Sequence, residues 1–206
     1  MKTVQATAVK PDTSEAILDA MDTLMARYGY RKTTMDDLAR EAGISKRTIY
    51  LYFPSKEEVA LSSIGRVVQT AQARMKQIAI EDGDPRLLLE NMLVERVMAR
   101  VRSVEGYRQS LDELFEAVRP AYLARRQTSF DAEQQIIADA LIAGQTAGIF
   151  SFDDANETAH DLLSATNAYL PYSLSVRELG QIKEIENRVH RLARLLVNGL
   201  EGKETR

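Results

Sequence analysis

The apolar residues of this chain recur every three to four positions over nearly its whole length, a spacing that restricts it to helices. The alternation of a half-buried strand appears nowhere in the sequence. We therefore predict an all-α fold with about nine helices. The clearest stripe runs for five turns near the C-terminus: Ile182, Ile185, Val189, Leu192, Leu196 and Leu200.

Capping residues, glycines and prolines mark where the helices begin and end. The first predicted helix begins at Thr13 or Ser14, either of which can cap it, and ends at Gly29. Proline offers no backbone N–H to a helix, so Pro120 is predicted to break one. The other predicted helices cover about 35–42, 46–51, 56–79, 85–102, 105–118, 121–147, 154–170 and 178–200.

Composition bounds the chemistry that is available to the chain. With 45% apolar and 28% charged residues among 206, it has enough apolar surface to form a core. It contains no cysteine and two histidines, which excludes disulfides and the usual zinc sites, and we expect no cofactor and no metal. Without a 20-residue apolar run or a signal-peptide pattern, we expect a cytoplasmic protein.

The charge of the chain is unevenly distributed. The formal net charge is −3. Seven basic and three acidic residues lie between Arg27 and Lys56, which gives this segment +4 and leaves −7 for the remainder. A basic segment on an acidic body is the pattern of a local nucleic-acid contact, although an ordinary solvated surface can show the same excess.

Two short helices joined by a tight turn lie within this basic segment. Thr34 is predicted to cap the first of them, together with Asp37, and Ser45 the second. Such a helix-turn-helix places its second helix in the DNA major groove, which is about 12 Å wide. On that helix Lys46, Arg47 and Tyr50 share a face. The apolar residues that can pack behind it are Ile44, Ile49 and Phe53.

The stretch TTMDDLAREAGISKRTIYLYFPSKEEV resembles the signature of tetracycline-repressor-like (TetR/AcrR family) regulators. The matching features are a threonine-capped helix, A-x-x-A-G-I-S, the aromatic run Tyr50-x-Tyr52-Phe53 and the trailing Ser55-Lys56-Glu57-Glu58. The resemblance covers the first 60 residues. Beyond them only the number and length of the helices and the overall size agree.

The resemblance implies which residues contact DNA. Asp36 departs from the family pattern, since a carboxylate there repels phosphate, and it receives no DNA-binding role. The alternatives are that the tyrosines form a small aromatic core and that the basic side chains are solvated surface. The predicted DNA-binding residues are Thr34, Lys46, Arg47, Thr48, Tyr50, Tyr52 and Lys56.

The resemblance also implies a division of the chain into an arm (1–12), a helix-turn-helix domain (13–60) and a ligand-binding and dimerisation domain (61–206). His160 is a further candidate for facing a ligand, whereas His190 is expected on the solvated surface. Every candidate in the third region also fits an ordinary helical core. The dimer candidates are Ala159, Leu163, Leu192 and Leu196, and the ligand candidates are Met92, Tyr107, Phe115, Tyr122, Phe130 and Gln145.

The resemblance implies a homodimeric DNA-binding regulator, most simply a repressor that is released from a near-palindromic operator by a small-molecule effector. It also implies a bacterial protein that is nucleoid-associated when bound to DNA. Its expected partners are double-stranded DNA, the effector and a second copy of the chain, with no membrane. The alternative is a helical protein-interaction module whose helix-turn-helix does not read DNA. An enzyme on a helical bundle finds no support, because the sequence contains no Gly-x-Ser-x-Gly, Walker or Gly-x-Gly-x-x-Gly motif.

Overall fold

Nine α-helices and three short 3₁₀ segments make up the structure, a computed structural model that describes residues 12–200. No β-strand occurs in that range, so the all-α prediction is confirmed. No helix in the same range is long and apolar enough to cross a membrane. The predicted arm (1–12) lies outside the described residues except for its last position. The helices are α1 (Thr13–Tyr28), α2 (Met35–Glu41), α3 (Lys46–Tyr52), α4 (Lys56–Ala79), α5 (Pro85–Ser103), α6 (Leu111–Thr146), α7 (Ala155–Thr166), α8 (Val176–Leu179) and α9 (Ile182–Asn198).

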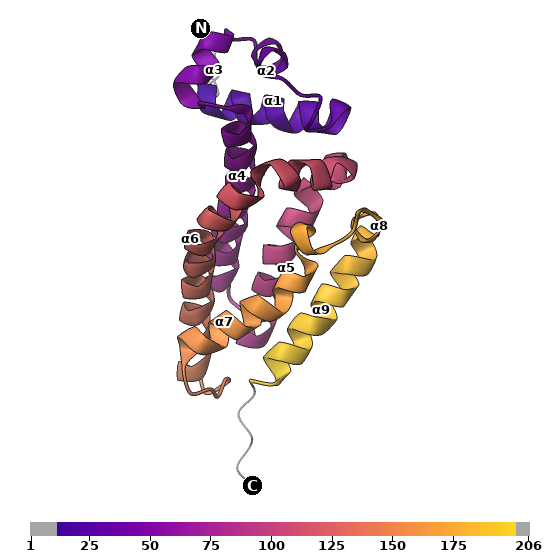
Figure 1. Cartoon of the computed structure of the whole chain (residues 1–206). Helices are drawn as coiled ribbons and strands as arrows, with labels where there is room; N and C mark the ends of the chain where they lie inside the picture. Colours follow the sequence, from indigo (N-terminus) through magenta and orange to yellow (C-terminus); the bar gives the residue numbers. More distant parts are fainter. Residues whose placement is uncertain (1–11, 201–206) are drawn as a thin grey trace, which may run out of the picture.

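The first three helices form a small head at the N-terminal end of α4, and the remaining helices pack around the other end of α4 (Figure 1). Ser55 caps α4 by accepting a hydrogen bond from the Glu58 N–H at 3.2 Å. The buried face of α4 runs through both parts of the molecule, from Val59 to Met75. A single 24-residue helix therefore belongs to the head and to the body.

Arg66 of α4 ties the head to this helix. Its guanidinium group lies 2.8 Å from Glu15, 2.7 Å from Asp19 and 2.7 Å from Asp22, all on α1. Ser63 adds a hydrogen bond to Asp22. Because these contacts come from one turn of α4 and two turns of α1, they hold the two helices at a fixed angle.

Two details of the predicted helices are wrong. α1 begins at Thr13, as predicted, but Asp12 caps it, since the Asp12 side chain accepts a hydrogen bond from the Ser14 N–H at 3.3 Å. Pro120 does not divide the segment into two helices, because α6 continues through it and bends on its way along the body (Figure 1). Pro120 is exposed, so water can solvate the carbonyl that the missing N–H leaves without a partner. The residues before α6 form a 3₁₀ segment, Glu105–Ser110.

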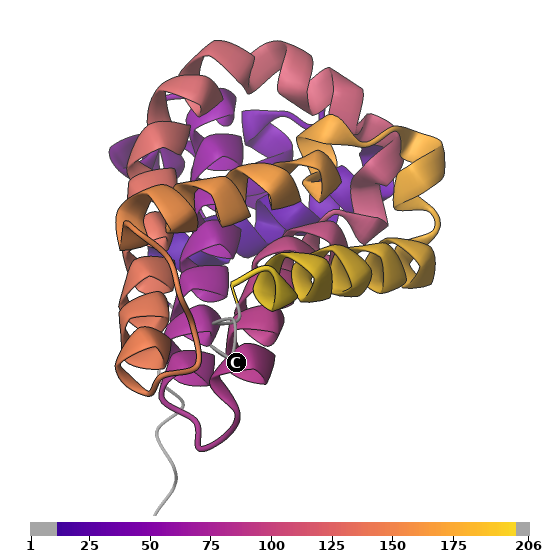
Figure 2. The ribbon, with the colours of Figure 1, turned by 90° about the horizontal axis from the view of Figure 1, so that it is seen from below.

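The C-terminal helices are shorter than the sequence predicts. The helix expected over 154–170 ends at Thr166 and is followed by 3₁₀ turns at Asn167–Tyr169 and Pro171–Ser173. The helix expected over 178–200 begins at Ile182, after the short α8. α7 and α9 contact each other and cover one side of the body (Figures 1 and 2).

A buried carboxylate joins α5 to α9. Glu90 is 6% exposed and accepts hydrogen bonds from His190 Nδ1 at 3.0 Å and Arg194 Nη2 at 3.2 Å. Burial alone would raise the pKa of Glu90, but the hydrogen bonds and charges of these two partners lower it below its ordinary value. The prediction of His190 as solvated surface is therefore wrong, because its ring reaches into the α5–α9 contact.

Replacing Glu90 with Gln should lower the free energy of unfolding by about 1.5–3 kcal/mol at pH 7, since it removes two hydrogen bonds to a charged group. The pKa of Glu90 is depressed in the folded chain, so its stabilisation is complete above the ordinary value of about 4.5 and is lost as the pH falls through the folded value. Urea unfolding at pH 7 and below pH 4 tests this. The difference between the variant and the original chain should shrink in acid, and Glu81→Gln on the surface should change nothing.

Gly144, near the end of α6, is in contact with the ring of Phe150. A Cβ atom at this position would lie 2.2 Å from Phe150 Cδ2 and 2.4 Å from Cε2. Phe150 is 4% exposed and has little room to move. The glycine thus allows the chain to turn back against α6 after Gly148, whose φ of 73° lies in the left-handed region.

Substituting Gly144 with Ala should destabilise the fold by about 1–3 kcal/mol, because the methyl group forces the Phe150 ring out of place. The matched control is Gly65→Ala in α4, where nothing lies within 4 Å of the added Cβ. Alanine favours helix over glycine by up to about 1 kcal/mol, so this control should unfold at the same temperature or higher. Equal effects of the two substitutions would contradict the close contact at Phe150.

Candidate nucleic-acid interface and internal cavity

The orientation of α3 is fixed by the residues on its inner side. Ile49 is fully buried and Phe53 is 8% exposed, and both belong to the core that includes Leu38 of α2. Ser45 caps α3 through a hydrogen bond that its Oγ accepts from the Thr48 N–H at 3.0 Å. Gly43, with φ 67°, makes the turn between the two helices. The opposite side of α3 consequently points to solvent.

The outer side of α3 presents basic and phenolic side chains. Tyr50 is 49% exposed and Tyr52 is 47% exposed, and Arg47 is exposed as well. The alternative of a small aromatic core therefore holds for Phe53 and fails for the two tyrosines. Thr48 is half-buried, and its hydroxyl lies 2.8 Å from that of Ser45. The exposed side of α3 matches the chemistry that reads bases and phosphates in a DNA groove.

Lys46 and Asp36 form an ion pair across this surface. Lys46 Nζ donates to Asp36 Oδ2 at 2.8 Å, which links the first turn of α3 to the first turn of α2. This hydrogen bond raises the pKa of Lys46. Asp36, the departure noted in the sequence, thus partly neutralises a predicted DNA-binding residue.

Thr34 and Lys56 have structural roles whether or not they also contact DNA. Thr34 Oγ1 accepts from the Asp37 N–H at 3.2 Å, and the Thr34 backbone N–H donates to Asp37 Oδ2 at 3.1 Å, which together form the predicted capping box. The Thr34 hydroxyl also donates to Asp37 Oδ2 at 2.6 Å. Lys56 Nζ donates to the Tyr30 carbonyl at 3.1 Å and lies 4.3 Å from the centre of the Tyr30 ring. Partial burial lowers the pKa of this ammonium group.

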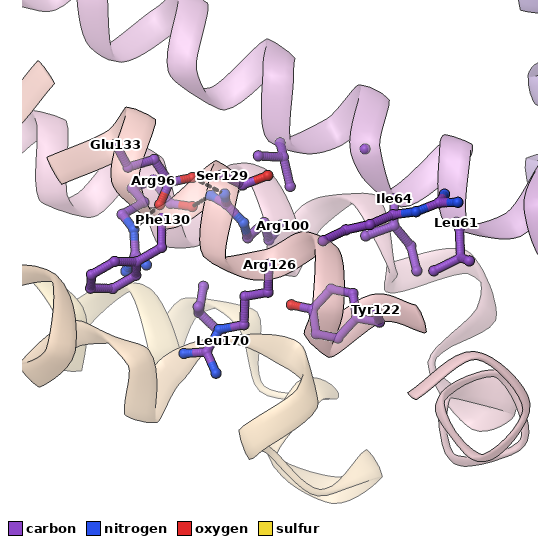
Figure 3. A pocket seen from close by; sticks show the side chains of 13 residues that line it. Leu61, Ile64, Arg96, Arg100, Tyr122, Arg126, Ser129, Phe130, Glu133 and Leu170 are labelled. Atoms are coloured by element: carbon purple, nitrogen blue, oxygen red, sulfur yellow. Dashed lines mark hydrogen bonds and ion pairs between the residues drawn. The ribbon is translucent and has the colours of Figure 1, made fainter. Parts of the chain in front are cut away.

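A charged cavity lies in the body between α4, α5 and α6 (Figure 3). Its apolar wall includes Leu61 and Ile64 of α4, about two turns beyond the first residue of that helix. The charged groups that line it are Arg96, Arg100, Arg125, Arg126 and Glu133. Its free volume of about 70 Å³ holds about two water molecules at roughly 30 Å³ each.

The first cavity adjoins a second one, of about 40 Å³, that lies toward η1 (Glu105–Ser110) and has a mostly apolar wall. Among the predicted ligand residues, Phe130 lines the first cavity, Tyr107 and Phe115 line the second, and Tyr122 lines both. Met92 is fully buried in the core. Gln145 is exposed and donates to the Phe152 carbonyl. The exposed His160 ring stacks edge-on against Phe130, with 5.2 Å between centroids.

The charged residues that line the cavity were not predicted from the sequence. Arg96 and Glu133 are each about 2% exposed and form an ion pair of 2.6 Å, which Arg100 completes from the next turn of α5. One pattern in the sequence could have indicated them: Arg96 and Arg100 are four positions apart on a face of α5 that is otherwise mostly apolar. Charged side chains are almost never fully buried without a partner, so such an interruption predicts a buried network.

The predicted dimer residues divide into two groups. Ala159 and Leu163 are fully buried within the chain, so they cannot form the contact between two copies, and this assignment is wrong for both. Leu192 and Leu196 of α9 are half-buried, and Leu195 between them is 71% exposed. A leucine with this exposure leaves apolar surface available to a partner.

Comparison with known proteins agrees with this geometry. The profile of the family described as "Bacterial regulatory proteins, tetR family" matches residues 17–62, which span α1 to the first turns of α4. The HTH-type transcriptional repressor KstR2 of Rhodococcus jostii is 29% identical over 153 residues, which covers 73% of this chain and 74% of that protein. Residues 17–62 therefore form a helix-turn-helix region of the TetR type.

A second relative matches over a shorter stretch. The HTH-type transcriptional regulator EthR of Mycobacterium tuberculosis is 40% identical over 73 residues, 35% of this chain and 34% of EthR. The chain thus matches about a third of the length of this relative.

Solved structures share the whole architecture. A transcriptional regulator from Cytophaga hutchinsonii superposes with a TM-score of 0.75 at 22% identity, covering 91% of this chain and 98% of that chain. A TetR/AcrR family regulator from Thermobifida fusca gives 0.65 at 26% identity, with 90% and 97% covered. The fold of these regulators therefore extends over both the head and the body of this chain.

Proposed function

We propose that this chain is a TetR-family transcriptional repressor that binds a near-palindromic operator as a homodimer and is released from it by a small-molecule effector. The observation that carries the proposal is the outer side of α3. Arg47 and Tyr50 are three residues apart and exposed on one face, and Tyr52 is exposed at the end of the helix, while Ile49 is buried on the inner side. A short helix with this division fits the major groove and offers donors to phosphates and base edges.

The ligand response is supported by the path of α4. The helix begins in the head, and its residues Leu61, Ile64 and Val68 line the cavity, about 18 Å from Lys56 to Val68 at 1.5 Å per residue. A ligand larger than the small cavity must push α4 away from α5 and α6. Because Arg66 couples α1 to α4, such a displacement carries the head with it. Couplings of this kind typically change affinity by about 5–150-fold.

A second link joins the cavity to the head. Arg125 lines the cavity and also donates to both carboxylate oxygens of Glu58, at 2.8 and 2.9 Å, in the first turn of α4. An effector that draws Arg125 inward would loosen this contact. The cavity and the DNA-facing head are therefore connected by one ion pair as well as by the body of α4.

Arg47→Ala and Tyr50→Ala should each weaken binding to DNA without lowering the melting temperature, because both side chains are exposed. The measurement is selection of bound sequences from random duplex DNA, followed by titration at several salt concentrations. A two-fold-symmetric site should emerge. The logarithm of the binding constant should fall linearly with the logarithm of the salt concentration, by about 0.9 for each phosphate contacted.

Lys76→Ala, which removes one exposed positive charge at the far end of α4, is the matched control and should keep the original affinity. If neither the original chain nor any variant enriches a sequence at any salt concentration, the chain does not read DNA. The outer side of α3 would then serve a protein partner, which is the interaction-module alternative.

Leu195→Glu should convert the dimer to a monomer at micromolar concentration, because α9 offers its exposed leucine beside Leu192 and Leu196 as the contact with a second copy. Sedimentation velocity on the full chain measures this. Leu87→Glu places the same charge at a 57% exposed leucine of α5 and should leave the dimer intact. Dissociation by both substitutions, or by neither, would contradict a dimer that is formed through α9.

A further inference from the structure

The two adjoining cavities have different chemistry. Guanidinium groups from α5 and α6 line the first, whereas Val67, Val104, Leu114 and other apolar side chains line the second. Together they form one elongated space with a cationic end and an apolar end. They share four wall residues, Ile64, Val68, Arg100 and Tyr122.

The carboxylates around the cationic end are already occupied. Glu133 accepts from Arg96 Nε through one oxygen and from Arg100 through the other. The remaining nitrogens of Arg96 donate to the Leu163 carbonyl and to the side chains of Thr166 and Asn167. Arg96 and Glu133 therefore serve the packing of α5, α6 and α7.

Arg126 is the guanidinium group that the fold does not neutralise. Within residues 12–200 no carboxylate pairs with it, and its Cζ atom lies 4.8 Å from the centre of the Tyr172 ring. Arg125 pairs with Glu58, and Arg96 and Arg100 both pair with Glu133. The four arginines of the cavity wall therefore have two carboxylates between them, which leaves an excess of two positive charges. An uncompensated excess in a partly enclosed space attracts an anion.

Two phenols lie beside these arginines. The rings of Tyr122 and Tyr172 are 5.9 Å apart. The Tyr172 hydroxyl is buried and makes no well-aligned hydrogen bond within the described part of the chain, and the Ser173 side chain beside it slightly lowers its pKa. Burial is the larger effect and raises the pKa of both hydroxyls, so each stays protonated and is able to donate. A ligand oxygen would give the Tyr172 hydroxyl a well-aligned acceptor. Figure 3 shows Tyr122, Arg100 and Arg126 around the same space.

We propose that the effector is an organic carboxylate with a compact apolar body. Its carboxylate binds between Arg100, Arg126 and the Tyr172 hydroxyl, and its apolar body enters the second cavity. This inference rests on the proposed ligand response and names the chemical class to which that response belongs.

The arrangement disfavours the other ligand classes. A cation would add to the positive excess, and a neutral alcohol would leave Arg126 without a counter-ion. A carboxylate accepts two parallel hydrogen bonds from one guanidinium group, and hydrogen bonds between charged groups are about twice as strong as neutral ones. It also competes with Glu58 for Arg125, which gives the anion a direct effect on the first turn of α4.

Calorimetric titration of the full-length protein at low salt tests the proposal with four carboxylates: hexanoate, octanoate, benzoate and 4-phenylbutyrate. Each is compared with the alcohol and the amine that carry the same body. We expect at least one carboxylate to bind at least tenfold more tightly than its alcohol, and the amines not to bind. Arg126→Gln should weaken the carboxylate at least tenfold and leave the alcohol unchanged. Tyr172→Phe should weaken the carboxylate about three- to tenfold.

Arg74→Gln, an exposed arginine of α4 outside both cavities, is the matched control and should bind the carboxylates as the original chain does. Circular dichroism confirms that each variant is folded. The proposal is overturned if alcohols or amines bind as tightly as their carboxylates, if Arg126→Gln changes nothing, or if no carboxylate binds with Kd below about 1 mM.

A failure of the proposed repressor function can be distinguished from a failure of the proposed carboxylate site. The titration uses protein alone, so a chain that binds no DNA can still bind the carboxylate, and only the repressor proposal would then be contradicted. Carboxylate binding that leaves the affinity for a selected operator unchanged would support the anion site and contradict release by ligand.

Discussion

The packing of α4 against both the head and the body is the constraint on which the rest of this structure depends. Its N-terminal turns are held by Ser55, by the ion pair of Glu58 with Arg125 and by the contact of Arg66 with three carboxylates of α1. Its middle turns line the cavity. Under the proposed ligand response, a displacement of these middle turns would move the head as well, because a helix is stiff along its axis.

The body contains more buried charge than a simple helical bundle. Glu133 and Arg96 at the centre and Glu90 at the α5–α9 contact are almost inaccessible, and all three are satisfied by several hydrogen bonds. Buried ion pairs contribute little net stability compared with apolar residues, since desolvation offsets the attraction. Their hydrogen-bond geometry instead fixes which turns of neighbouring helices face one another. The cavity lies beside this network and has arginines that the network does not neutralise.

The exposed residues of the helix-turn-helix differ in how they are paired. Arg47 and the two tyrosines are exposed, whereas Lys46 pairs with Asp36 and Lys56 donates to the Tyr30 carbonyl. An anion that contacts Lys46 would compete with the Asp36 carboxylate. Two of the basic residues in this region, Lys46 and Lys56, are therefore paired within the chain itself.

Most helices and the helix-turn-helix could be predicted from the sequence, because they follow from the periodicity of apolar residues. The caps at Thr34, Ser45 and Ser55 could also be predicted, because each is a hydrogen bond between residues three positions apart. The predicted break at Pro120 is wrong, because a proline can remain inside a helix when the carbonyl four residues earlier is exposed to water. Three features could not be predicted without the folded structure. Ala159 and Leu163 point inward, and His190 contacts Glu90. Arg96 and Arg100 both pair with Glu133. These contacts join residues 33 to 100 positions apart, and a single sequence carries no local signal for such distances.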